Sequence, residues 1–456
     1  MRTSIEQSEI TAFTEEIKNF SAVHDSFCKG DISEEDFLNR LARFESHELS
    51  KENLFNQLNA YFCLGCAYNI LKIRNLDCSK AYYRNEYKDK EVCFFRNVLY
   101  IANHVRKEEW LSLYYSAWKI SMRATLYLAN AYDHLGRFNE ALQYYDEAIL
   151  DEANEYEVEL NKGFCYANMH AFWSETEPFV VRRAQEILQK YPRKFDSLQP
   201  GLREMVCSWV VPSFEDPLQK FEDTPEGCFY RWLSDNHLWL NRYSDVSCRS
   251  VLAQGHNLKL PCLHESKERH ELFVSSFAEM KEQYIEAVNG LYKAIFSEDC
   301  VNEYQLKCSF KELYSILDKT ALFIAQYLYI DLPTQSINFD KVWYDKSRKN
   351  INPKILAYDS NLSLHAIFSI HRDVYANDAS AYVPDEQSKD LRKIRNYLEH
   401  RFIKIEDGPM RFDEKQLRIS KDELILNALK IAQIVRCSLI YLCNFLMHAE
   451  YDKTQV

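Results

Sequence analysis

An arginine, an asparagine and a histidine stand close together near the C-terminal end of the sequence, in the stretch Arg395-Asn396-Tyr397-Leu398-Glu399-His400. Histidine titrates near neutral pH and can transfer protons. Arginine stays charged and binds phosphate oxygens through its planar fork. Cleavage of RNA by the neighbouring 2′-hydroxyl needs a base, an acid and positive charge beside the phosphate. These side chains suit that chemistry, which requires no metal, and we expect no cofactor.

Helical geometry limits what one copy of this stretch can do. Asn396 and His400 are four residues apart and share a helix face, whereas Arg395 and His400 are about 140° apart around the helix. A twofold-symmetric dimer would bring two arginines and two histidines to one cleft, so we expect a homodimer. The alternatives are an exposed helix histidine at His400 and a surface pair between Arg395 and Glu399.

A basic strip surrounds these residues. Residues 389–404 contain six Lys or Arg and two Asp or Glu, although the whole chain has a net charge of −12. Residues 1–225 hold 26 Lys or Arg against 36 Asp or Glu, a net of −10, which leaves −2 for residues 226–456. The acidity therefore belongs to the front of the chain. Within the strip, Lys393, Arg401 and Lys404 are either solvated charges or contacts to an RNA backbone.

The elements that position this strip are expected to be helices. The sequence has only 9 glycines and 11 prolines, which favours long helices with short connections. Four long helices are expected, over about 266–297, over 303–330, after Pro384 where the helix carries Arg395, and over 420–448, with a shorter helix near 361–376. We predict an all-α fold with an up-and-down four-helix bundle over 228–456.

The front of the chain shows internal repeats. The stretch 125–149, "TLYLANAYDHLGRFNEALQYYDEAI", has small residues and tyrosines at positions that let two helices pack closely, and it resembles a tetratricopeptide repeat. The first-helix pattern also occurs at 61–68. We predict a helical cap over 1–49, a repeat solenoid over 50–211 and a linker over 212–227. The concave surface of the solenoid would bind a protein or ligand; the alternative is a scaffold that only packs on the next domain.

Cellular location is inferred from what the sequence lacks. The 14 cysteines have no regular spacing, the first residues lack the apolar core of a signal peptide, and we find no apolar run long enough for a membrane span. We expect reduced, mostly buried thiols in a cytoplasmic protein. The pair Cys63 and Cys66 has no second pair to complete a zinc site.

Four blocks strengthen the interpretation of the motif. They are "YRWLSDNHLWLNRYSDV", "KELYSILDKTALFIAQYL", "LRKIRNYLEHRFIKI" and "KIAQIVRCSLIYLCNFL". With Arg-Asn followed after three residues by His, they resemble the HEPN superfamily, in a prokaryotic lineage that couples HEPN to tetratricopeptide repeats. The resemblance covers about 228–450, and the repeats extend it towards residue 50. It implies a metal-independent endoribonuclease that works as a dimer, often in toxin or antiphage roles.

The resemblance also assigns residues. It implies that Arg395 and His400 are catalytic and that Asn396 is their polar companion. Asp318 and Lys319 recur in the lineage; they are either a buried ion pair or a support for the active site. A second function class remains open, a non-enzymatic adaptor in which the bundle serves dimerisation or nucleotide binding. An intact motif favours the enzyme.

Overall fold

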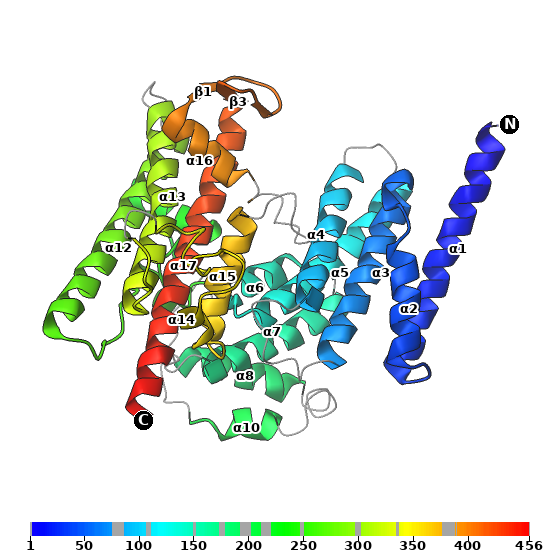
Figure 1. The fold of residues 1–456 in the computed structure, drawn as a ribbon, viewed down its shortest axis with the longest axis horizontal. Coiled ribbons are helices and arrows are strands. Elements are labelled where there is room, and N and C mark those ends of the chain that lie inside the picture. The colour runs from blue at the N-terminus through cyan, green and yellow to red at the C-terminus, as the bar shows by residue number, and fades with distance from the viewer. Residues whose placement is uncertain are drawn as a thin grey trace. The chain divides into compact units, whose positions relative to one another are not determined.

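The computed structural model describes residues 2–74, 86–105, 111–148, 152–172, 178–191, 202–210, 220–246, 250–296, 302–333, 337–375, 388 and 390–455. Figure 1 shows a chain built almost entirely of helices. The first group of elements is α1 (Arg2–Lys29), α2 (Glu34–Glu45), η1 (Leu49–Lys51), α3 (Leu54–Arg74), α4 (Glu86–Val105), α5 (Leu111–His134), α6 (Phe138–Glu147), α7 (Glu152–Phe172), α8 (Pro178–Lys190) and α10 (Leu202–Ser208).

The second group contains the predicted bundle and a short sheet. Its elements are α11 (Pro225–Asp235), η3 (Val251–Ala253), α12 (Lys267–Phe296), α13 (Asn302–Tyr327), α14 (Pro353–Leu356), α15 (Leu362–Tyr375), α16 (Leu391–His400), β1 (Phe402–Ile405), β2 (Arg411–Phe412), β3 (Gln416–Ile419) and α17 (Lys421–Gln455). The predicted all-α class is confirmed.

The chain forms two compact units. Unit 1 contains residues 1–132, 143–161 and 378–383, and unit 2 contains residues 133–142, 162–377 and 384–456. The boundaries expected from sequence, 1–49, 50–211, 212–227 and 228–456, remain predictions. Residues 212–219 of the expected linker lie outside the described residues.

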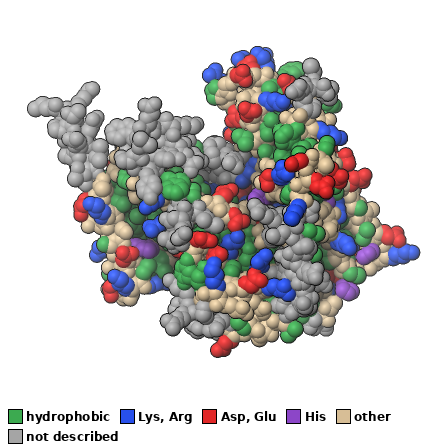
Figure 2. Space-filling model, turned by 180° about the vertical axis from the view of Figure 1, so that it is seen from behind, with side chains coloured by type: hydrophobic (Ala, Val, Ile, Leu, Met, Phe, Trp, Pro, Cys, Tyr) green, Lys and Arg blue, Asp and Glu red, His purple; other side chains and the backbone are tan. Residues whose placement is uncertain are grey.

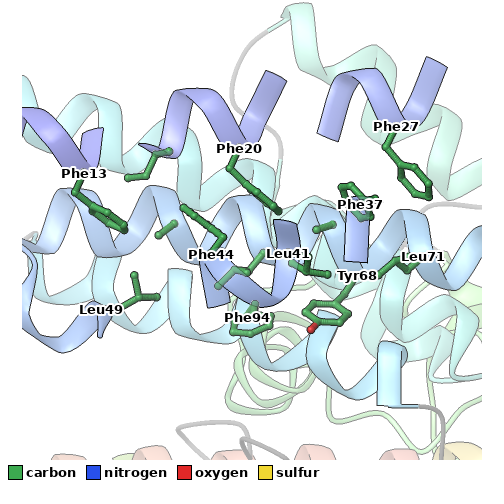
Figure 3. Close-up of a cluster of buried hydrophobic side chains, with 14 residues drawn as sticks. Phe13, Phe20, Phe27, Phe37, Leu41, Phe44, Leu49, Tyr68, Leu71 and Phe94 are labelled. Carbon is green, nitrogen blue, oxygen red and sulfur yellow. The ribbon is translucent and has the colours of Figure 1, made fainter. Parts of the chain in front are cut away.

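Aromatic side chains from α1 and α2 form the core of the first helices in unit 1 (Figure 3). Phe13, Phe20 and Phe27 recur every seven residues along α1, which places them on one face. The Phe20 ring stacks on Phe44 with centroids 4.3 Å apart, and the Phe27 ring stacks on Phe37 at 4.1 Å. Leu64 and Tyr68 of α3 complete this buried cluster.

A glycine lets α3 and α4 pack closely. A Cβ atom at Gly65 would lie 2.5 Å from Cε1 of Phe95, a fully buried ring on α4. Real side chains do not approach so closely, so only glycine fits at this crossing. Gly65 lies within the first-helix pattern of the repeat at 61–68. The tetratricopeptide assignment itself remains a prediction.

The bundle of unit 2 follows the predicted helical ranges closely. The predicted 266–297, 303–330, 361–376 and 420–448 correspond to α12, α13, α15 and α17. Caps fix two of the starts, because Ser266 Oγ accepts from the Arg269 amide and Ser420 Oγ accepts from the Glu423 amide. Helix α17 packs against α12, α13 and α15, so the long helices form one bundle. The helix expected as the third long one is α16, which has 10 residues and lies against α13 and α15.

Helix α17 corrects one statement made from the sequence. Over Lys421–Thr454 it is long and apolar enough to cross a membrane by length and composition, whereas the apolar patterning of the sequence predicts no such segment. Two-thirds of its most apolar window (67%) is buried inside the protein. That burial is typical of a core helix, and the side chains from Leu439 to Leu442 are fully buried.

A small sheet follows α16, which the sequence analysis did not predict. The strand order is β1-β3-β2, with β1 parallel and β2 antiparallel to β3. Figure 1 shows β1 and β3 at the same end of unit 2 as α16. The helix ends because Arg401 adopts an extended conformation (φ −144°, ψ −165°). Lys404, expected within a continuous basic stretch of the motif, therefore lies on a strand. The expected start after Pro384 falls outside the described residues.

Candidate active site

Helix α16 has one apolar face and one charged face. Leu391, Ile394 and Tyr397 are buried and spaced three residues apart, which anchors one side of the helix. The opposite side exposes Asn396 and His400. Glu399 forms an ion pair with Lys311 of α13, with Oε1 and Nζ 3.5 Å apart. The surface pair considered between Arg395 and Glu399 is therefore replaced by a pair between helices.

Arg395 points towards the bundle rather than away from it. Its guanidinium carbon lies 5.7 Å from the centre of the Tyr314 ring on α13. Its Nη1 donates to Asn396 Oδ1 over 3.4 Å. The buried Tyr314 hydroxyl donates to the Tyr375 hydroxyl over 3.0 Å. Burial, followed by these tyrosine contacts, raises the pKa of Tyr314 well above its ordinary range, so the phenol beside Arg395 is neutral.

Asp318 lies in the same neighbourhood as Arg395. Its Oδ1 accepts a hydrogen bond from the Phe339 amide over 2.9 Å. Burial raises the pKa of Asp318, while the Phe339 amide and then the positive charge of Arg395 oppose that rise. Lys319 turns elsewhere, and its Nζ lies 2.5 Å from Glu279 Oε1 and donates to Gln283 Oε1 over 2.7 Å. The two neighbours therefore form no ion pair with each other, and Asp318 is the one near the motif.

His400 is the last residue of α16 and its side chain is exposed. Among the described residues no hydrogen bond or ion pair joins it to another side chain, including Arg395. This follows from the five-residue spacing, which directs the two side chains to different sides of one helix. A single copy therefore presents an arginine that packs against the bundle and a histidine that faces solvent.

The three predicted RNA-backbone contacts differ in their surroundings. Lys393 Nζ lies 3.1 Å from Asp390 Oδ1. Arg401 donates from Nη1 to the Tyr397 hydroxyl over 3.2 Å. Lys404 Nζ lies 2.6 Å from Glu406 Oε2, with more than half of its side chain exposed. Each cation is therefore accessible at the surface, and Lys393 and Lys404 are partly neutralised.

Residues that could bind a metal are not grouped together in the part of the chain that the structure describes. It contains no group of three His, Cys, Asp or Glu residues placed to hold a metal ion. The cysteines at 63 and 66 lie on α3, where burial raises the pKa of Cys63 to about 12 and raises that of Cys66 as well. Thiolates, the form that binds zinc, are disfavoured there.

The comparison with known protein families covers this site. Residues 275–450 match the family model described as LA2681-like HEPN. The C-terminal part of the chain is a HEPN domain. The match includes α13, α15, α16 and α17 as far as residue 450, so every residue of the motif lies within it. HEPN membership fits a nuclease or another nucleotide-related function. No curated protein and no solved structure matches the chain.

Sequence reasoning missed parts of the candidate site that the fold supplies. Tyr314 and Tyr375 come from α13 and α15, and only the packing of these helices brings them to Arg395. The strands after His400 were also missed. The alternation in "FIKI" and "QLRI" is a strand signal that could have indicated them.

Proposed function

We propose that this protein is a metal-independent endoribonuclease whose catalytic groups are Arg395 and His400, with Asn396 as their polar companion. One observation carries the proposal. Within the matched HEPN domain, Arg395 is held against Tyr314 while His400 is exposed at the end of the same helix. The two side chain types that phosphodiester cleavage needs are thus present and accessible to a polyanion.

The reaction is an attack of the RNA 2′-hydroxyl on the adjacent phosphorus. A bond forms between O2′ and phosphorus while the bond from phosphorus to the leaving O5′ breaks. His400 transfers a proton, either from the 2′-hydroxyl or to O5′, and Arg395 stabilises the charge on the phosphate oxygens. The products end in a 2′,3′-cyclic phosphate and begin with a 5′-hydroxyl. Arg395 and His400 supply proton transfer and charge, so the scheme proceeds without a metal.

A homodimer completes the site in this proposal. The two proton transfers need two titratable groups, and one copy offers one histidine in the motif. A twofold axis beside α16 would place a second His400 and a second Arg395 across the same cleft. HEPN domains commonly dimerise, which supports this arrangement. Asp318 is proposed to support Arg395 electrostatically, while Lys319, held by Glu279, has a structural role on α12 and α13.

The test is end-group analysis of RNA cut by the purified protein. We expect cyclic phosphate and 5′-hydroxyl ends, activity in excess EDTA, and no cutting at a position whose 2′-hydroxyl is replaced by hydrogen. Cutting at the deoxy position, or loss of activity in EDTA that added metal restores, would contradict the mechanism. Failure to cut any RNA would favour the adaptor, in which the HEPN domain only dimerises or binds a nucleotide.

The biological role is proposed from the arrangement of domains. We infer that the helical repeats over 50–211 sense a protein or ligand, or restrain the nuclease, in a cytoplasmic toxin or antiphage effector. The helix pair α3 and α4 with its close crossing at Gly65 supports the repeats. A fragment that ends before the HEPN domain should still bind the partner of the repeats if this division of labour holds.

A further inference from the structure

The small sheet after His400 has an inner and an outer face that its register defines. The pairs are Phe402 with Gln416, Ile403 with Leu417, Lys404 with Arg418 and Ile405 with Ile419. On the other edge, Arg411 pairs with Arg418 and Phe412 with Leu417. Directly paired side chains lie on the same face of a sheet, and alternate residues of a strand lie on opposite faces.

Packing fixes which face is covered. Leu417 and Ile419 are fully buried, and β1 and β3 lie against α16. The Phe412 ring lies 5.8 Å from the Tyr397 ring of that helix. The inner face is therefore the one that carries Ile403, Ile405, Phe412, Leu417 and Ile419. The outer face consists of the remaining residues, Phe402, Lys404, Arg411, Gln416 and Arg418, which we call the outer sheet face.

Three cations lie in one row across the outer sheet face. Lys404 on β1, Arg418 on β3 and Arg411 on β2 are neighbours through their pairing. Like charges directly opposite each other destabilise a sheet. Glu406 contacts Lys404 (2.6 Å) and Arg418 (3.4 Å), and Asp413 contacts Arg418 (3.5 Å). Among the described residues no carboxylate contacts Arg411. The row thus keeps an excess of positive charge.

An aromatic ring stands next to this row. Phe402 is 77% exposed, although a phenylalanine normally gains free energy by burial. It shares the outer sheet face with Lys404 and comes two residues after His400. Figure 2 shows Lys and Arg side chains, mixed with acidic ones, at the end of the molecule where Figure 1 places the sheet. A polyanion that also carries flat apolar groups would pair with the cations through its charge and stack on the Phe402 ring.

We propose that the outer sheet face binds single-stranded RNA next to the scissile phosphate, with a base stacked on Phe402 and the backbone along Lys404, Arg418 and Arg411. This rests on the proposed function for the identity of the polymer. Unpaired bases can stack on an exposed ring, whereas bases in a duplex are already stacked. Gln416, paired with Phe402, can hydrogen-bond a base edge.

Binding is measured without cleavage by using a labelled oligouridylate with 2′-O-methyl groups, which cannot attack. Phe402→Leu keeps an apolar side chain but removes the ring, and we expect a loss of affinity of about tenfold. Phe296→Leu, which removes a 59% exposed ring at the end of α12, is the matched control and should leave the affinity nearly unchanged. Arg411→Gln should reduce the slope of log K against log salt by about 0.7. Lys346→Gln, a paired exposed cation on a loop, should not.

The outcomes separate this inference from the proposed nuclease. Unchanged affinity in both Phe402→Leu and Arg411→Gln would overturn the inference even if the protein cuts RNA. Equal affinity for a duplex, independent of Phe402, would also overturn it. Binding to anionic lipid vesicles that depends on Phe402, with no RNA binding, would assign the face to a membrane instead. RNA binding that depends on Phe402 in a protein that cuts nothing would support the face and contradict the nuclease.

Discussion

The contact between Arg395 and the Tyr314 ring predicts how replacements at the motif behave. Arg395→Ala should lower kcat at least about hundredfold, because the charge on the phosphate oxygens is left uncompensated. His400→Ala should cost about hundredfold or more through loss of proton transfer. Arg395→Lys should recover little of the activity that Arg395→Ala loses, since an ammonium lacks the planar fork of the guanidinium. Lys346→Gln is the control in the same cleavage assay, and full activity of both alanine variants would exclude this site.

Asp318 allows a prediction about stability and pH. Burial raises its pKa, so the folded state holds the proton more tightly than the unfolded chain does. The ionised carboxylate therefore costs stability above its folded pKa, and the cost disappears as pH falls below the unfolded value. Asp318→Asn should increase the free energy of unfolding at neutral pH, with the gain shrinking towards acid pH. Urea unfolding at several pH values measures this, and a variant less stable at neutral pH would contradict it.

The residues of the site were predictable to different degrees. Arg395, Asn396 and His400 are neighbours in sequence, so the motif alone pointed to them. Tyr314 and Tyr375 are 61 residues apart, and their contact depends on how α13 and α15 pack. Sequence spacing carries no direct sign of such a contact, because ordinary core tyrosines have the same pattern.

The crossing of α3 and α4 gives a prediction at the scale of helices. Gly65→Ala adds a methyl 2.5 Å from a ring carbon of the buried Phe95. Alanine favours a helix over glycine by about 1 kcal/mol, but overpacking costs about 1–3 kcal/mol and should win. We expect a lower midpoint of urea unfolding. Adding Phe95→Leu should relieve the clash, so the double variant should lose less stability than the sum of the single ones. A Gly65→Ala variant at least as stable as the unchanged protein would contradict this prediction, because it would mean that α3 and α4 can move apart without cost.

The end of α16 shows where helical patterns fail. The stretch "LRKIRNYLEHRFIKI" has apolar residues that fit a helix up to His400. After His400, β-branched Ile403 and Ile405 alternate with Phe402 and Lys404. This segment forms a strand because it pairs with β3. The partner strand β3 spans 416–419 and lies outside this stretch. The alternation within the stretch is therefore a weaker sign of a strand than the pairing that forms in the folded protein. Long helices such as α12 were predicted well, because many turns repeat the same apolar stripe.

At the scale of the whole molecule, the separation of Arg395 and His400 predicts a dimer. Light scattering should give twice the mass of one chain, because one copy does not assemble both groups at one phosphate. Adding His400→Ala copies to the unchanged protein should lower the activity more than simple dilution does, because a mixed dimer keeps one His400 instead of the two that the proton transfers need. Adding Lys346→Gln copies is the control. A monomer that cleaves RNA would contradict the shared site.

The order of synthesis has a consequence for α17. This helix packs against α12, α13 and α15, all of which are translated before it. Its 35 residues take roughly 2–7 s to synthesise at ordinary rates. During that time the nascent bundle lacks the helix that covers its apolar faces, so it cannot hold α13 and α15 in their final positions beside Arg395. Under the proposed function, a newborn chain on the ribosome would therefore acquire an ordered site only after α17 has packed, which would separate the synthesis of this protein from its attack on the surrounding RNA.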